Sequence, residues 1–109
     1  MIHLTASTSI QVATERADFR KGIDGFVALC QHHLRQNPRS GTLYVFLNRN
    51  ATMIRILAYD HCGAGYWLMT KRLSRGRFRG WPQAGSPLSP LAAHRLRQLF
   101  TGLLESGDD

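Results

Sequence analysis

The sequence predicts an α+β fold, in which an antiparallel meander sheet of three to four strands packs with two amphipathic helices. Three apolar runs of strand length lie in the middle of the chain, and apolar residues recur at helical spacing before and after them. With 109 residues and 43% apolar side chains, the chain suits one modest core. We expect a single domain over residues 1–109, with its core at about 8–104 and a frayed acidic tail at 105–109.

The N-terminal part of the chain predicts a short strand followed by a helix. Ser9–Ala13 alternates apolar and polar side chains, as a half-buried strand does. Apolar residues then recur every three or four positions, which predicts a helix over about 21–36 that ends at Asn37-Pro38. Cys30 lies on the apolar side of this helix, so we expect a core thiol there, whereas Cys62 falls in a predicted turn.

Three runs rich in aromatic and β-branched residues, at 42–47, 53–59 and 66–73, predict the meander. The connections between them are short and contain Asn and Gly, which favours antiparallel neighbours. After a Gly- and Arg-rich stretch, Ser89-Pro90 has the character of a helix start, and we expect this second helix to cover an edge or a face of the sheet. The expected core residues are Leu43, Val45, Leu47, Ile54, Ile56, Leu68, Phe26, Val27, Leu96 and Leu99.

The charges are distributed unevenly along the chain. Fourteen Lys and Arg against seven Asp and Glu give a net charge of +7, and twelve of the fourteen cations are arginines. Between Gly25 and Leu104 there are eleven basic residues and a single acid, Asp60. The arginine fork recognises phosphate well, so this composition favours a polyanionic partner, and solubility alone is the alternative explanation.

The strongest local motif is the segment 71–79, in which five of nine residues are basic. Glycine lets the backbone approach a phosphate chain, arginine neutralises it, and an aromatic ring can stack on an unpaired base. The expected nucleic-acid contacts are Arg72, Arg75, Arg77 and Arg79, with Lys71 secondary and Phe78 or Trp81 as stacking groups. In the alternative interpretation, both rings pack in the core and the arginines only point into water.

A secondary basic site is expected from Arg20, Lys21, Arg49 and Arg55. The first two residues stand where a strand turns into the first helix, and amides at a helix start can hold an anion. The neighbouring Asp18 and Asp24 can instead pair with these cations, and we favour that structural interpretation.

The sequence predicts neither an enzyme nor a metal or cofactor site. Two-metal nuclease chemistry needs several converging carboxylates, and the candidates Asp18, Asp24 and Asp60 make it the weakest hypothesis. No zinc-ligand spacing, phosphate loop or dinucleotide fingerprint occurs. No apolar run is long enough for a membrane span and the start lacks a secretory pattern, which predicts a cytoplasmic protein, compatible with association with the nucleoid.

Several spaced motifs make the sequence resemble a known family, the TnpB-type or Orf2-like accessory proteins of the insertion-sequence sixty-six group of transposable elements. The matching segments are, in order, DFRKGIDG at 18–25, SG at 40–41, LYVFLNR at 43–49, IRIL at 54–57, YD at 59–60, KRL at 71–73, GRF at 76–78 and WP at 81–82. The sequence departs from the family pattern at two places. Asn50-Ala51-Thr52 stand where the family has further basic residues, which weakens a basic hairpin tip, and Arg79-Gly80 lengthens the stretch before Trp81.

The resemblance implies an accessory protein for bacterial transposition that is encoded beside a larger transposase. Together with the charge cluster, it leads to the hypothesis of nucleic-acid binding, to DNA rather than RNA, in support of that transposase. The competing hypothesis is an adaptor whose basic face docks the transposase or a second accessory protein of the same element. The oligomeric state stays open, and exposed sheet edges are compatible with a dimer.

Overall fold

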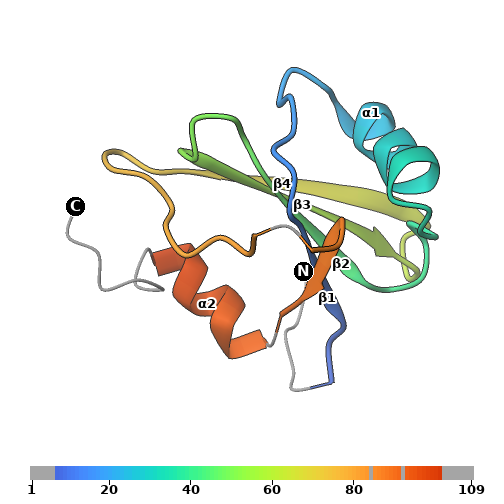
Figure 1. The fold of residues 1–109 in the computed structure, drawn as a ribbon. Coiled ribbons are helices and arrows are strands. Elements are labelled where there is room, and N and C mark those ends of the chain that lie inside the picture. The colour runs from blue at the N-terminus through green and yellow to red at the C-terminus, as the bar shows by residue number, and fades with distance from the viewer. Residues whose placement is uncertain (1–6, 84, 92, 102–109) are drawn as a thin grey trace.

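A five-stranded sheet forms the centre of the fold, and helices lie on both of its faces (Figure 1). The computed structural model describes residues 7–83, 85–91 and 93–101. The strands are β1 (Ile10–Ala13), β2 (Leu43–Leu47), β3 (Met53–Asp60), β4 (Gly65–Arg72) and β5 (Leu88–Pro90), in the spatial order β4-β3-β2-β1-β5. The α+β class is confirmed, with one strand more than expected.

The sheet is mixed rather than purely antiparallel. β2, β3 and β4 form the expected antiparallel meander, in which Tyr59 pairs with Tyr66. β1 instead pairs with β2 in parallel, with Val12 opposite Val45, so the all-antiparallel sheet was wrong. The connection from β1 to β2 contains the first helix, which makes it long enough for the crossover that parallel neighbours need.

The first helix lies close to its expected range but widens in its second half. α1 (Ile23–Ala28) continues directly into a π-helical turn, η1 (Leu29–His33). In this wider turn the N–H of Leu34 donates to the carbonyl of Leu29 at 3.0 Å. The helical turn ends at His33, and Arg35, two residues later, has a left-handed φ of +58°, as is common just beyond a helix terminus.

The C-terminal segment forms an edge strand before its helix begins. Residues 89–90, expected to start the second helix, belong to β5, which pairs antiparallel with β1. The N–H of Thr14 donates to the carbonyl of Pro87 at 3.0 Å, and the N–H of Leu91 donates to the carbonyl of Ile10 at 3.0 Å. This pairing satisfies backbone groups on the outer side of β1, so the helix α2 starts only at Ala93 and runs over Ala93–Thr101.

The two faces of the sheet bury separate clusters because side chains alternate along each strand. Tyr44 and Phe46 of β2 pack with Phe26 and Cys30 of the first helix. The other face packs against Leu96 of α2 and also buries Phe78 and Trp81, as the following cluster shows: Ile10, Val12, Leu43, Val45, Leu47, Ala51, Ile54, Ile56, Ala58, Phe78, Trp81 and Leu96.

Most of the expected core is confirmed. The expected residues that are buried are Leu43, Val45, Leu47, Ile54, Ile56, Phe26 and Leu96. Val27 and Leu68 are only half-buried, and the side chain of Leu99 lies outside the described residues, as does the expected acidic tail at 105–109. Cys30 is buried as expected, and Cys62 is exposed in a turn.

Candidate nucleic-acid interface

The β2–β3 turn, residues 48–52, stands at one end of the sheet and is built around Asn48. The Oδ1 of Asn48 accepts hydrogen bonds from the backbone N–H groups of Thr52 at 2.8 Å and Met53 at 3.1 Å. Ala51 completes the turn with a left-handed φ of +59°. The side chain of Arg49 is exposed at the tip, so the folded turn presents one cation to solvent.

Segment 16–21 lies directly beside this turn. The N–H of Ala17 donates to the carbonyl of Leu47 at 2.9 Å, where β2 ends. The guanidinium of Arg16 also donates to the carbonyl of Arg49 at 3.3 Å. The expected secondary site residues Arg20, Lys21 and Arg49 therefore come together at this end of the sheet.

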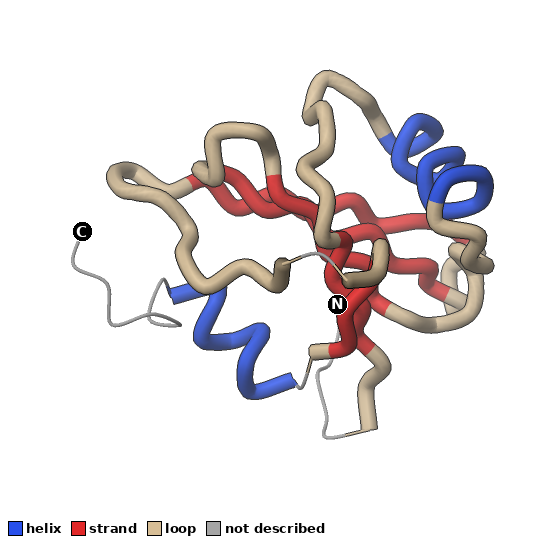
Figure 2. Tube along the Cα trace, viewed as in Figure 1, coloured by secondary structure: helices blue, strands red, loops and turns tan. Residues whose placement is uncertain are grey.

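The loop that follows β4 lies on the other side of the same turn. The N–H of Leu73 donates to the carbonyl of Thr52 at 2.9 Å, and the N–H of Phe78 donates to the carbonyl of Ala51 at 2.7 Å. In Figure 2 the β2–β3 turn lies between segment 14–22, at the top, and this loop, at the left. The principal and secondary basic sites expected from the sequence thus belong to one surface.

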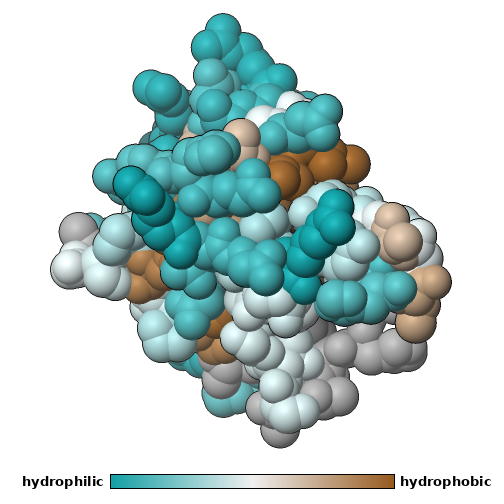
Figure 3. Space-filling model, turned by 90° about the vertical axis from the view of Figure 1, so that its right-hand side faces the viewer, coloured by the Kyte–Doolittle hydropathy of each residue, from teal (hydrophilic) through white to brown (hydrophobic). Residues whose placement is uncertain are grey.

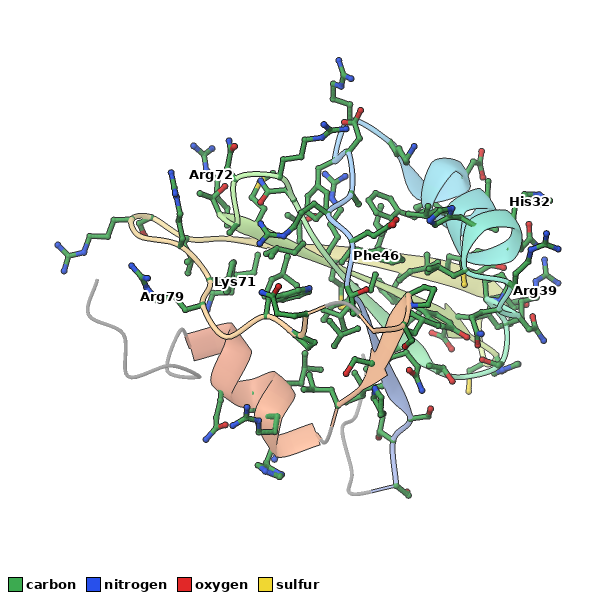
Figure 4. The ribbon with its side chains drawn as sticks, viewed as in Figure 1. His32, Arg39, Phe46, Lys71, Arg72 and Arg79 are labelled. Atoms are coloured by element: carbon green, nitrogen blue, oxygen red, sulfur yellow. The ribbon has the colours of Figure 1, made fainter. Side chains whose placement is uncertain are left out.

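We call this surface the basic end and define it by eight exposed cations: Arg16, Arg20, Lys21, Arg49, Arg72, Arg75, Arg77 and Arg79. Figure 4 shows Arg72 and Arg79 at this side of the molecule, with Lys71 nearby, whereas His32 and Arg39 lie at the opposite side. The side that carries α1 is also largely hydrophilic (Figure 3), so charge rather than polarity distinguishes the basic end. Arg16 was not expected in this site, because its sequence neighbourhood contains no cluster of basic residues.

Phe78 and Trp81 do not present their rings to solvent. Each is only 5% exposed, and both belong to the core cluster under α2. The Nε1 of Trp81 donates to the carbonyl of Ala13 at 2.9 Å, which satisfies the polar atom of the buried indole. The expectation that either ring stacks on a base is therefore corrected. The structure agrees with the alternative interpretation, in which both rings pack in the core.

Arg55, expected in the secondary basic site, is a structural residue instead. Its Nη1 donates to the carbonyls of Phe19 at 2.7 Å and Lys21 at 3.0 Å, and its Nε donates to Oγ1 of Thr70 at 2.7 Å. The guanidinium also lies over the ring of Phe19, 4.9 Å from its centroid. Arg55 therefore ties the segment before α1 to the sheet.

Asp18 and Arg20 form an ion pair within the basic end. The Nη2 of Arg20 donates to Oδ2 of Asp18 at 2.8 Å, and the backbone N–H of Arg20 donates to Oδ1 at 3.0 Å. These hydrogen bonds hold the pKa of Asp18 well below its ordinary value, and the charge of Arg49 acts in the same direction. The structure thus contains the local ion pair that we favoured, and this carboxylate offsets one positive charge.

The carboxylates proposed for a metal nuclease do not converge. Asp18 lies at the basic end, whereas Asp60 ends β3 at the opposite end of the sheet. Asp60 accepts hydrogen bonds from the N–H of Cys62 at 3.0 Å and from Nε1 of Trp67 at 3.1 Å, so it serves a turn. Among the described residues, no group of three or more His, Cys, Asp or Glu could hold a metal ion. In the same residues, no helix is long and apolar enough to cross a membrane.

The fold and this surface define a small α+β domain with one strongly basic end. Residues 8–106 match the family model described as IS66 Orf2 like protein, and the chain belongs to this family. The resemblance noted from the sequence motifs is thereby confirmed. Membership makes the protein a transposition-associated accessory protein.

Two similar proteins are known from Sinorhizobium fredii (strain NBRC 101917 / NGR234). The uncharacterized protein y4hO is 34% identical over 94 residues, which cover 86% of this chain and 79% of that protein. The uncharacterized protein y4jC is 37% identical over 78 residues, which cover 72% of this chain and 65% of that protein. No solved structure matches the chain at a significant level.

Proposed function

We propose that the protein binds nucleic acid through the basic end, and that DNA bound in this way is how it supports transposition. The observation that carries the proposal is the meeting of three segments, 16–21, 48–52 and 72–79, at one end of the sheet. Eight exposed cations gather there, and the one acid among them, Asp18, is already paired. A surface of this kind attracts a polyanion and releases counterions when it binds.

The chemistry of this surface favours the phosphate backbone over the bases. Seven of the eight cations are arginines, whose donors match phosphate oxygens bidentately. Phe78 and Trp81 are buried, so segment 72–79, which we call the Arg-rich loop, offers charge rather than exposed rings. We therefore expect binding with weak sequence preference and no strong preference for single strands over duplex.

The test is fluorescence anisotropy across a salt series, with duplex from the ends of the element, unrelated duplex, single-stranded DNA and RNA. Contact with three to five phosphates gives a slope of log K against log salt of about −3 to −5. Arg77→Ala should reduce the magnitude of this slope by about 1. Arg35→Ala is the matched control, because it removes the same charge from an exposed position beyond the first helix. Absence of binding to every probe at low salt would refute the proposal.

The second candidate function is that of an adaptor for an acidic protein surface. Because the Arg-rich loop offers charge without exposed rings, the same surface also suits carboxylates on the transposase or on a second accessory protein of the element. Pull-down of the transposase with wild type, Arg77→Ala and Arg35→Ala separates the two functions. Capture that depends on Arg77, without binding to any nucleic acid, would favour the adaptor.

A further inference from the structure

The two edges of the sheet differ in how well they are protected from pairing with another strand. β5 forms one edge, has three residues and ends in Pro90, which has no N–H to donate. β4 forms the other edge, has eight residues and is paired with β3 along its whole length. In the described part of the chain, no strand lies on the outer side of β4. A long, regular and proline-free edge of this kind is a template for a further strand.

The surface beside this edge is apolar. Trp67 of β4 is 45% exposed, and its indole is held in place by the hydrogen bond to Asp60. On the same face of the sheet, an open hollow of about 290 Å³ is lined by Ile54, Ile56, Met69, Thr70 and Lys71. A large exposed indole next to an apolar hollow is typical of the centre of a protein interface.

The charges along β4 favour one particular occupant. The strand ends in the cations Lys71 and Arg72, whereas its first residue, Gly65, pairs with the carboxylate-bearing Asp60. A parallel copy of the strand would place cations beside cations, which destabilises a sheet. An antiparallel copy places the cationic end of each strand beside the Asp60 end of the other. The edge is therefore complementary to itself under two-fold symmetry.

We propose that two copies of the chain form a dimer by antiparallel pairing of their β4 strands. This pairing joins the two sheets into a single ten-stranded sheet. In a register centred on Leu68, odd-numbered residues of one β4 stand opposite odd-numbered residues of the other, and even-numbered opposite even-numbered. The corresponding faces of the two sheets therefore form one continuous face. Trp67 lies opposite Met69 of the second copy, and Lys71 lies opposite Gly65. Since Gly65 has no side chain, Lys71 can extend across it toward the second copy's Asp60.

This arrangement fixes where the two basic ends lie in the dimer. Each β4 leads directly into the Arg-rich loop at its C-terminal end, and the antiparallel strands run in opposite directions. Eight residues of antiparallel strand span about 27 Å. The dimer therefore presents two basic ends on opposite sides of the interface, separated by at least about the length of β4.

The first test is sedimentation equilibrium of the full chain over a concentration series. We expect a monomer–dimer equilibrium whose dissociation constant rises about tenfold or more in Trp67→Lys, because the indole is removed and two lysines are added at the centre of the interface. Ile23→Lys is the matched control, since Ile23 is 40% exposed but lies on α1, and it should dimerise like wild type. A monomeric wild type at about 100 times the concentration used for DNA binding would overturn the proposal, as would equal dimerisation of both variants.

The second test is hydrogen exchange of wild type, which remains informative even if Trp67→Lys folds poorly. Outward-facing amides of residues 65–71 should exchange more slowly at high protein concentration than at low concentration, whereas amides of β5 should show no such change. Concentration-dependent protection elsewhere, with none in β4, would place the interface on another surface and refute the proposal. Neither test involves nucleic acid, so their outcome is independent of the proposed binding function.

Discussion

Replacing Arg55 by methionine tests whether this arginine supports the fold or binds phosphate. Methionine keeps an unbranched side chain that can still cover Phe19, but it removes all three hydrogen bonds of the guanidinium. A hydrogen bond to a charged group contributes about 1.5–3 kcal/mol, and the half-exposed setting of Arg55 reduces that value because water competes. We therefore expect the free energy of unfolding to fall by about 2–3 kcal/mol.

The measurement is urea unfolding followed by circular dichroism. For a small domain the denaturant slope is roughly 1–3 kcal/mol per molar urea, so the midpoint should fall by about 1–3 M. Arg55→Lys should recover little of the stability lost in Arg55→Met, because one ammonium cannot reproduce the planar guanidinium that reaches Phe19, Lys21 and Thr70. Arg49→Met is the control: it removes an exposed cation of the basic end and should change stability by less than about 0.5 kcal/mol while weakening nucleic-acid binding. If Arg55→Met were as stable as Arg49→Met, the structural role of Arg55 would be refuted.

Three further predictions follow from buried or paired groups. Trp81→Phe leaves the carbonyl of Ala13 without its indole donor and should cost about 1–3 kcal/mol in the same urea assay. Burial raises the pKa of the Cys30 thiol to about 11, so the native protein should react with one equivalent of a thiol reagent, at Cys62, and the unfolded protein with two. The ion pair lowers the pKa of Asp18 in the folded protein. The pair therefore stabilises the fold fully above the pKa of Asp18 in the unfolded chain, about 4, and this contribution is lost as the pH falls through the lower pKa of the folded state. Between Asp18→Asn and wild type, the difference in unfolding free energy should therefore shrink below pH 4; a difference independent of pH would exclude this role.

The elements that could be predicted from the sequence are those specified by local patterns. The β2–β3–β4 meander joins neighbours through short turns, and both its strands and its turns leave signals within a few residues. The parallel pairing of Val12 with Val45 joins residues far apart in the chain, and nothing near either residue indicates it. β5 was missed for the same reason: Ser89-Pro90 has the local character of a helix start, and only the unpaired edge of β1 explains why it becomes a strand.

In the candidate site too, features with a local sequence signal could be predicted, and features that depend on distant contacts could not. The Arg-rich loop was found because its cations are adjacent in sequence, whereas its continuity with Arg20 and Arg49 depends on hydrogen bonds between distant backbone segments. The sequence contains one indication that Arg55 has a structural role. Arg55 stands two residues before the apolar Leu57 on the same face of β3, where the first helix packs, so burial against that helix could have been expected.

The buried aromatic residues connect the stability of the core with the position of the arginines. Phe78 and Trp81 anchor the backbone on both sides of Arg79, while the arginine side chains of the loop remain exposed. An anchored loop loses less conformational entropy on binding phosphate than a disordered loop would lose.

Phe78→Leu tests this connection. The substitution keeps an apolar side chain and should cost about 1–1.5 kcal/mol of stability, so the domain stays folded. It should nevertheless weaken nucleic-acid binding, although residue 78 itself contacts no ligand in our proposal. Arg77→Ala should instead weaken binding without moving the urea midpoint. Unchanged binding by a folded Phe78→Leu variant would mean that the arginines act without the support of the core, and that the positions of Phe78 and Trp81 serve stability alone.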